Sequence, residues 1–286
     1  MNRRKFIAGA AAGLGAAYVG ANGMEKALAI PTPTGKAEAN DTVVLGKTGI
    51  RTSRLAMGTG TIGGGGSSNQ TRTGQLTRLL RTGYDRGLIF FDTADSYGSH
   101  PEVAEAVSQL PRDKVVIMTK CDNRDAKGAK ADIDRYRREL KTDYIDILLM
   151  HCMTEGDWTE RYRGVMDVFE EAKQKKIIRA HGCSCHTLEA LRAAAKSPWV
   201  DVDLVRLNPV GAHMDADPQT VLGVIKEMRA QGKGIIGMKI LGQGAMRTRQ
   251  DEAIRFALGS GVLDAFTIGA ESDAEQADLM RRIAAA

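Results

Sequence analysis

The order of apolar and amphipathic segments along this 286-residue chain predicts an α/β protein, a (β/α)8 TIM barrel with an N-terminal β-hairpin. First, short continuous runs rich in Val, Ile and Leu recur eight times after residue 53, as is typical of parallel strands buried on both faces. Second, a segment with helical periodicity follows each run. Eight such pairs close a parallel barrel, so we expect residues 41–286 to form one domain.

The elements are expected in strict alternation. Residues 41–53 contain two alternating segments around a Gly-Lys-Thr-Gly turn, which predicts a hairpin that caps the floor of the barrel. The strands are then expected at 54–60, 88–92, 115–120, 145–151, 178–184, 202–207, 234–241 and 264–270. The helices are expected at about 72–86, 101–109, 128–140, 161–176, 187–195, 218–231, 251–259 and 273–284. In the fourth helix, Val165, Val168 and Phe169 form the apolar stripe, and the basic C-terminus suits the helix dipole.

Residues 1–29 have the features of a twin-arginine (Tat) signal peptide. The pair Arg3-Arg4 is followed by a weakly apolar, Ala- and Gly-rich stretch and then by the cleavage pattern Ala27-Leu28-Ala29. The stretch is too short and too rich in Gly to span a bilayer, so we expect no stable membrane insertion. We expect the Tat export machinery to carry the protein to the periplasm, and residues 30–40 to form a linker.

The charge of the chain argues against a nucleic-acid partner. The formal net charge is +5, and four basic residues and one acidic residue within 1–29 contribute +3 of it. The remaining chain is therefore near +2 and contains no basic run, which excludes a nucleic-acid-binding surface of the usual kind. With 43% hydrophobic residues the chain can bury a sizeable core, and a monomer is the default expectation.

Four ionisable residues lie at, or just after, the ends of predicted strands. Asp92 and Tyr97 lie in LIFFDTADSYG, Lys120 ends VVIMTK, and His151 ends YIDILLMH. Because chemistry in parallel barrels takes place at the C-terminal strand ends, we expect these side chains to converge. A Tyr hydroxyl has an ordinary pKa of about 10, which a nearby ammonium lowers by stabilising the phenolate. A carboxylate keeps the Lys charged and a His orients a substrate oxygen, so the set can protonate a carbonyl oxygen while hydride reaches its carbon.

Each of these four residues has a structural alternative when it is taken alone. An Asp after a strand is commonly a helix cap, a Tyr commonly packs, and a Lys is commonly solvated. The occurrence of all four at strand ends favours the catalytic assignment.

Several segments of the chain resemble the aldo-keto reductase family. They are LGKTGIRTSRLAMGTG, FDTADSYG, VVIMTK, LKTDYIDILLMH and the GCS that ends the fifth predicted strand, and the resemblance covers about residues 43–280. It implies a (β/α)8 barrel and a nicotinamide cofactor. It also implies that Tyr97 is the general acid, that Asp92 and Lys120 tune it, and that His151 positions the carbonyl group.

The resemblance also implies a set of cofactor-binding positions. They are Gly58, Thr59, Ser184, Met238, Lys239, Leu241, Gly242, Gln243, Glu271 and Gln276. Where the family has an Asn and a Gln that contact the nicotinamide amide, this chain has Cys185 and Leu204, and Met238 replaces the stacking aromatic ring. Glu271 falls in the family's clamp for the 2′-phosphate, which it would repel, although it could accept from a ribose hydroxyl. The expected cofactor is therefore NADP or NAD.

The four cysteines lie near the ends of strands and are Cys121, Cys152, Cys183 and Cys185. The segment HGCSCH at 181–186 invites a metal site, but C-x-C-H lacks the paired spacing of a structural zinc site. Strand alternation places Ser184 on one face and its two cysteine neighbours on the other, so we expect buried thiols facing the helices and no metal. An oxidising periplasm permits a disulfide, whose pairing stays open.

We therefore expect a nicotinamide-dependent oxidoreductase that reduces an aldehyde or ketone, or oxidises the alcohol, with Tyr97 as general acid and base. Loops at 62–70, 153–159 and 210–217 would shape the substrate pocket. Since no nucleotide pool is expected outside the cytoplasm, the cofactor would be loaded before export and stay bound. The alternative, suggested by the altered cofactor contacts, is an exported, repurposed barrel that binds a small ligand without turnover. A metal-dependent hydrolase would need His and carboxylate clusters that the chain lacks.

Overall fold

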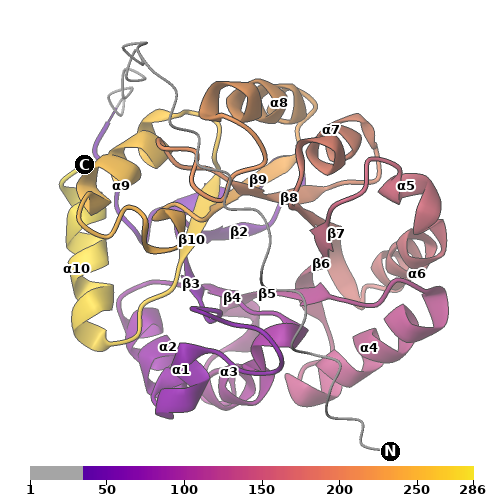
Figure 1. Ribbon diagram of the computed structural model, residues 1–286. Helices are drawn as coiled ribbons and strands as arrows, with labels where there is room; N and C mark the ends of the chain where they lie inside the picture. Colours follow the sequence, from indigo (N-terminus) through magenta and orange to yellow (C-terminus); the bar gives the residue numbers. More distant parts are fainter. Residues whose placement is uncertain (1–34) are drawn as a thin grey trace, which may run out of the picture.

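The computed structural model describes residues 35–286, so the predicted signal peptide and the start of the predicted linker lie outside the described residues. Figure 1 shows a ring of strands enclosed by helices. The strands of the ring are β3 (Leu55–Gly58), β4 (Phe90–Asp92), β5 (Val116–Cys121), β6 (Ile145–Met153), β7 (Ile178–Cys185), β8 (Val202–Arg206), β9 (Gly234–Met238) and β10 (Ala265–Ile268). Each pairs in parallel with the next, and β10 also pairs with β3, which closes the barrel. The predicted (β/α)8 fold is confirmed.

The helices cover the outside of the barrel. They are α1 (Asn69–Thr73), α2 (Leu76–Asp85), α3 (His100–Val107), α4 (Ala126–Glu139), α5 (Trp158–Arg161), α6 (Arg163–Gln174), α7 (Leu188–Lys196), α8 (Pro218–Ala230), α9 (Gln250–Gly259) and α10 (Asp273–Ala284). In the described residues, short 3₁₀ turns lie in the loops between strands and helices at η1 (Asp95–Tyr97), η2 (Arg112–Lys114) and η3 (Gly242–Gly244).

Two predicted helices are divided in the structure. The helix expected at 72–86 is α1 followed by α2, because Gly74 adopts a left-handed conformation with a φ of 65° and ends α1. The helix expected at 161–176 is α5 followed by α6, because Tyr162 has a φ of −106° and a ψ of 27°, outside the helical range. Both interruptions are local backbone events that apolar periodicity does not report.

Most barrel strands end one to three residues from the predicted position, and the differences in β9 and β6 occur at residues with a positive φ. Strand β9 stops at Met238 rather than at residue 241, because Lys239 turns the chain with a φ of 56°. Strand β6 continues to Met153, with a shift of register around Cys152, whose φ is also 56°. A positive φ is unfavourable for residues other than glycine, and such residues cluster at functional sites.

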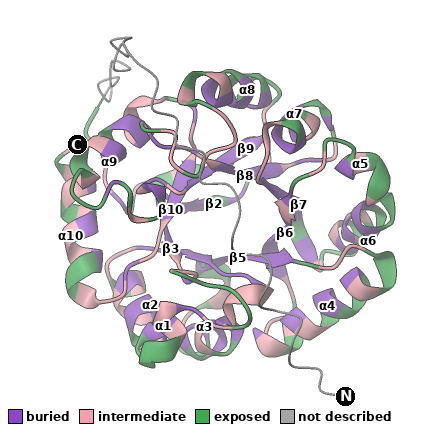
Figure 2. Ribbon diagram, viewed as in Figure 1, coloured by how far each residue is buried: buried purple, intermediate pink, exposed green. Residues whose placement is uncertain are grey.

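The hydrophobic core consists of two layers separated by the strands. In β5, Val116 and Met118 pack inside the barrel, whereas the intervening Ile117 packs under the helices. This alternation follows from the pleat of a strand, which points successive side chains to opposite faces. Figure 2 shows the result, since the strands are buried and the helices are buried only on their inner sides.

The N-terminal hairpin closes one end of the barrel. Its strands, β1 (Thr42–Val44) and β2 (Arg51–Ser53), are antiparallel. Between them, Leu45 and Ile50 are fully buried in the same cluster as the barrel interior. The backbone amide of Lys47 also donates to the carbonyl of Gly232 at 2.8 Å, in the turn before β9. The predicted hairpin is confirmed and forms the barrel floor.

Part of the predicted linker also contacts the barrel. Ala39 is buried, and its carbonyl accepts a hydrogen bond from the amide of Leu55 at 2.9 Å. Within residues 35–286, no helix combines the length and the apolar character needed to cross a membrane.

Replacing Leu45 by Ala is expected to lower the free energy of unfolding by about 2–5 kcal/mol, because it leaves a cavity in the barrel floor. Chemical denaturation measures the loss. The adjacent Val44, which is 41% exposed, provides the matched control, and Val44→Ala should change the free energy by less than about 0.5 kcal/mol. Equal losses in the two variants would contradict the role assigned to the hairpin.

Candidate active site

The four predicted catalytic residues come from three adjacent strands and lie at the C-terminal end of the barrel. Asp92 is the last residue of β4, Lys120 is near the end of β5, and His151 is near the end of β6. Tyr97 follows β4 in the turn η1. Because β4, β5 and β6 are neighbours in the barrel, the closed sheet brings these side chains together.

Lys120 forms the buried centre of this group. Its Nζ donates to Oδ1 of Asp92 at 2.5 Å and to the carbonyl of Thr93 at 2.7 Å. The other oxygen of Asp92 accepts from the Thr267 hydroxyl at 2.7 Å. Burial alone favours the neutral amine, but the Asp92 carboxylate outweighs that effect and raises the pKa of Lys120. Lys120 therefore carries its charge over the whole physiological range.

Tyr97 lies against this ammonium. Nζ of Lys120 is 4.8 Å from the centroid of the Tyr97 ring. Burial raises the pKa of the Tyr97 hydroxyl, and it exceeds the opposing effect of Lys120. The lowered pKa that the sequence suggested is therefore wrong for this structure, since desolvation outweighs the ammonium. The hydroxyl is protonated at neutral pH and available as a proton donor.

Two glycines allow Tyr97 to occupy this position. A Cβ on Gly60 would lie 2.4 Å from Cε2 of Tyr97, so only glycine leaves room for the ring. Gly98 has a φ of 64°, and a Cβ there would lie 1.9 Å from the carbonyl oxygen of Gly66. The glycine-rich loop after β3 is thus packed directly against the turn that carries the tyrosine.

The turn η1 is also anchored to the helix layer by an ion pair. The two carboxylate oxygens of Asp95 accept hydrogen bonds from the two terminal nitrogens of Arg135 in α4, at 2.8 and 2.6 Å. The hydrogen bond with Arg135 holds the pKa of Asp95 below its usual value, so this carboxylate stays charged. Two-point pairing of this kind fixes orientation as well as distance.

His151 completes the group. Its ring centroid is 6.0 Å from that of Tyr97, and the rings are nearly perpendicular. Nδ1 of His151 lies 2.8 Å from Oδ1 of Asp122, which fixes the ring. Burial opposes the charged imidazolium, but the hydrogen bonds with Asp122 and Cys152 outweigh it and raise the pKa of His151.

Cys152, directly after His151, has a special environment that sequence reasoning missed. Its backbone is left-handed, its amide donates to Oγ of Ser184 at 2.9 Å, and its Sγ lies 3.6 Å from Nε2 of His186. Burial disfavours the thiolate, but hydrogen bonds from His151 and His186 outweigh it and lower the pKa of Cys152 to about 6. The sequence does contain a signal for this contact, because His151-Cys152 and Cys185-His186 lie at or just after the ends of two successive predicted strands.

The predicted cofactor residues on the strands lie at the same end of the barrel. Gly58 ends β3, Ser184 is near the end of β7, and Met238 ends β9. Met238 belongs to the interior cluster, as does Leu204, which occupies the position of the expected amide-binding Gln. Thr59 is buried, and its hydroxyl is bonded to the carbonyl of Asp92 at 2.9 Å, so it supports the catalytic strand.

The loop after β9 carries four further predicted residues. They are Lys239, Leu241, Gly242 and Gln243. Left-handed backbone conformations occur at Lys239, Gly242 and Gln243, with φ values of 56°, 55° and 52°. Burial lowers the pKa of Lys239, and the nearby Arg206 lowers it further. Among the described residues, no carboxylate forms an ion pair with Lys239, so this loop presents a cation that an anion could neutralise.

The last two predicted cofactor residues lie near the start of α10. Glu271 accepts from the side chain of Asn69 at 2.8 Å and is half-buried. Gln276 is buried in the helix layer, where its side-chain amide accepts from Arg86 at 2.7 Å and donates to the carbonyl of Leu79 at 3.3 Å. The structure therefore places Glu271 at the surface of the barrel mouth and Gln276 beneath it.

The cysteines of the described chain are all free thiols. Cys183 and Cys185 belong to the layer under the helices, and Cys183 Sγ is 3.8 Å from Cys185 Sγ. The hydroxyl of Ser184 instead accepts from the amide of Cys152. The predicted alternation along this strand is confirmed.

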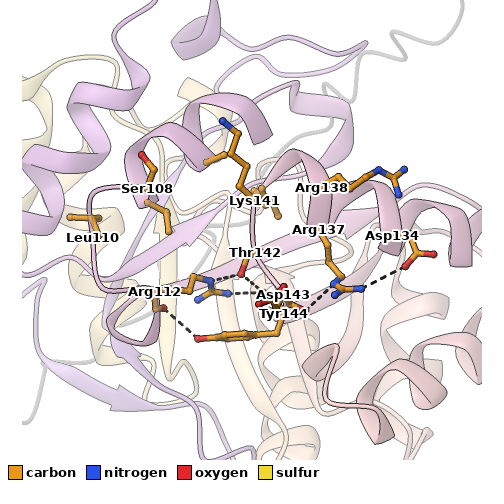
Figure 3. A pocket seen from close by; sticks show the side chains of 13 residues that line it. Ser108, Leu110, Arg112, Asp134, Arg137, Arg138, Lys141, Thr142, Asp143 and Tyr144 are labelled. Atoms are coloured by element: carbon orange, nitrogen blue, oxygen red, sulfur yellow. Dashed lines mark hydrogen bonds and ion pairs between the residues drawn. The ribbon is translucent and has the colours of Figure 1, made fainter.

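One cavity of the described structure lies away from these residues. It has a volume of about 680 Å³ and lies between α3, η2 and α4, at the N-terminal ends of β5 and β6 (Figure 3). Within it, Arg112 donates to the Thr142 hydroxyl and to the Tyr144 carbonyl, each at 2.8 Å. We assign the active site to the opposite end of the barrel, where the ionisable groups converge.

A family model described as "Aldo/keto reductase family" matches residues 54–274. L-galactose dehydrogenase from Arabidopsis thaliana is 23% identical over 71% of this chain and 66% of its own length. NADH-specific methylglyoxal reductase from Escherichia coli is 27% identical over 50% of this chain and 51% of its own length. The matches thus span about half to two thirds of these relatives.

Solved structures share the fold. An aldo-keto reductase structure from Pseudomonas aeruginosa superposes with a TM-score of 0.72 and 22% identity, covering 87% of this chain and 97% of that one. An aldo/keto reductase from Klebsiella pneumoniae in complex with NADP and acetate has a TM-score of 0.63 and 20% identity, covering 85% of this chain and 89% of that one.

Cys152 is expected to be alkylated by iodoacetamide faster than the other three cysteines. Because its pKa is lowered to about 6, the thiolate is present above that pH and is lost as the pH falls through it. The rate, followed by peptide mass spectrometry, should be nearly constant from about pH 8 to pH 7 and decrease below. In His186→Ala the decrease should begin at higher pH. A wild-type rate that already falls steeply between these values, as for an ordinary thiol of pKa about 8.5, would contradict the assignment.

Proposed function

The chain belongs to the aldo/keto reductase family, and from that premise we propose that it reduces an aldehyde or ketone with a nicotinamide nucleotide, or oxidises the corresponding alcohol. The observation that carries the proposal is the convergence of Tyr97 on the buried pair of Asp92 and Lys120, with His151 beside it. A protonated hydroxyl next to a fixed ammonium is suited to donate a proton to a carbonyl oxygen.

In this proposal each residue has a separate task. Tyr97 donates its proton to the carbonyl oxygen, and the Lys120 ammonium stabilises the phenolate that remains. Asp92 keeps Lys120 charged and in place. His151, fixed through Asp122, donates a hydrogen bond to the same carbonyl oxygen and orients it. In the oxidative direction the same groups remove the proton from the alcohol.

The barrel mouth fits a nicotinamide nucleotide, which supplies the hydride when it is bound. Burial, together with repulsion from Arg206, lowers the pKa of Lys239, and phosphate oxygens would stabilise its charged form. The left-handed backbone at Gly242 and Gln243 permits close approach of a phosphate to the chain. We assign Ser184 and Met238 to the nicotinamide end.

NADP and NAD are both candidates, and Glu271 favours NAD. Its carboxylate is held by Asn69, repels a 2′-phosphate and can accept from a ribose hydroxyl. The Escherichia coli relative is named as NADH-specific, whereas the Klebsiella structure contains NADP. Titration with each reduced nucleotide, followed by protein fluorescence quenching, distinguishes the two, and tighter binding of NADPH would contradict this use of Glu271.

We also propose that the Tat pathway exports the protein with its nucleotide already bound. The support is the Arg3-Arg4 pair with the Ala- and Gly-rich stretch after it. A nucleotide lost outside the cytoplasm would not be replaced, so an exported reductase needs a cofactor that stays bound.

Tyr97→Phe is expected to lower kcat by about 10²–10⁴-fold, because it removes the proton donor and leaves the ring in place. Nucleotide binding should be almost unchanged. Tyr84→Phe, in α2 away from the site, provides the matched control and should keep full activity. Retained turnover in Tyr97→Phe would overturn the assignment. Binding of nucleotide without turnover of any carbonyl compound by the wild type would support the repurposed barrel instead.

Replacing Arg3 and Arg4 together by Lys is expected to keep the protein in the cytoplasm, whereas the wild type should reach the periplasm. Cell fractionation measures the location, and mass spectrometry identifies small molecules released when each protein is denatured. NAD or NADP should be recovered from both proteins. Periplasmic wild-type protein without nucleotide would contradict loading before export.

A further inference from the structure

Three metal-binding side chains meet on the outer face of β7 and β8, away from the catalytic residues. They are Cys183 and Cys185 of β7 and Asp203 of β8. Cys183 is the direct partner of Asp203 in the parallel register, and Cys185 lies on the same face two residues further on. In Figure 1 these two adjacent strands lie beneath α7. All three residues are fully buried, and the proposed reduction uses none of them.

The distances among their ligand atoms suit one metal ion. Sγ of Cys183 is 3.8 Å from Sγ of Cys185, which is 3.7 Å from Oδ2 of Asp203. The three ligand atoms all lie within 4.8 Å of one another. A tetrahedral zinc ion with Zn–S bonds of about 2.3 Å separates two thiolates by about 3.8 Å. An ion placed between these atoms would therefore reach all three without rearrangement of the strands.

One atom of the cluster lacks a partner. Oδ1 of Asp203 is buried and accepts no hydrogen bond from the described residues. A buried carboxyl oxygen without a partner is costly, and such atoms call for a specific explanation. Coordination of a cation through both oxygens of Asp203 would give Oδ1 the interaction that it lacks.

The surrounding charge favours a divalent ion. Two thiolates and one carboxylate carry three negative charges, and a zinc ion neutralises two of them. Lys233 is also buried, and its Nζ donates to the carbonyl oxygens of Ser197 and Val200. The other nearby carboxylate, Asp215, is already paired with Arg206. Zinc therefore neutralises more of the charge of the three ligands than a monovalent ion such as copper(I) would.

We propose that Cys183, Cys185 and Asp203 form a structural zinc site that joins β7 to β8 beneath α7, with both carboxylate oxygens of Asp203 completing the four donor atoms. Binding releases one proton from each thiol and one from the carboxyl group, and no electrons are transferred. The cysteines alone lack the paired spacing of a zinc site, which is why the sequence predicted none. The third ligand comes from the next strand, 18 residues further along the chain.

The second cluster with metal-binding residues does not support a similar proposal. Asp95, His100 and Glu139 also lie close together. However, Arg135 donates to Asp95 and to Glu139, at 2.8 and 3.0 Å, so a cation of the protein already occupies that position.

The test measures metal in the full chain expressed with zinc or cobalt in the medium, so that the buried site can fill as the protein folds. Elemental analysis should find one zinc per chain. The cobalt form should show the sulfur-to-metal charge-transfer band and the intense visible bands of a tetrahedral thiolate site. In Cys183→Ser, Cys185→Ser and Asp203→Asn, zinc affinity should fall at least about tenfold, with loss or displacement of these bands.

Two matched variants separate this site from other thiols. Cys121→Ser removes a buried thiol that also adjoins a carboxylate, Asp132, but has no second cysteine beside it. Cys152→Ser removes the thiol paired with His186. Both should keep one zinc per chain and the cobalt spectrum. If Cys152→Ser abolishes zinc binding while the variants of the three proposed ligands retain it, the metal is bound at Cys152 and His186 and the proposal is wrong.

The wild type decides the question even where a variant fails to fold. A folded wild-type protein that takes up neither zinc nor cobalt during expression overturns the proposal. A disulfide between Cys183 and Cys185 in the isolated protein, detected by mass spectrometry without reduction, overturns it as well. Removal of the zinc with a chelator under reducing conditions should lower the Tm by at least about 2–4 °C. None of these measurements depends on reductase activity.

Discussion

The proposed chemistry of this barrel depends on the buried ion pair between Asp92 and Lys120. Burying two charges is costly unless they are close and their other hydrogen-bonding groups are satisfied. Here Thr267 and the Thr93 carbonyl satisfy those groups. Removal of one partner from such a pair typically costs about 3–5 kcal/mol, because the other charge is left alone. The pair therefore fixes a positive charge beside Tyr97, where a phenolate would form.

The site also depends on backbone conformations at the strand ends. Gly60 and Gly98 make room for Tyr97 and its turn, and these positions exclude a side chain on steric grounds. Cys152 and Lys239 are left-handed without being glycine, and each directly follows a strand residue of the proposed site, His151 or Met238. Strained residues of this kind persist only where the surrounding structure holds them. The regular barrel supplies that support.

The two faces of the strands have separate roles. The residues at the mouth of the barrel are those to which we assign catalysis and cofactor binding. On the outer face of β7 and β8, Cys183, Cys185 and Asp203 would hold the barrel together through a metal ion. Because successive residues of a strand point to opposite faces, a single segment such as HGCSCH contributes to both. Ser184 belongs to the first role and its two neighbours to the second.

The sequence by itself determined the order of strands and helices, the closure of the barrel, the hairpin and the four residues that we propose as the catalytic group. These follow from periodicity and from the rule that parallel strands end on one face. Tertiary structure decided that burial raises the pKa of Tyr97, that Cys152 lies against His186, and that Asp203 joins two cysteines. Desolvation, backbone strain and contacts between strands depend on which residues meet in space, and the linear pattern of a chain does not contain that information.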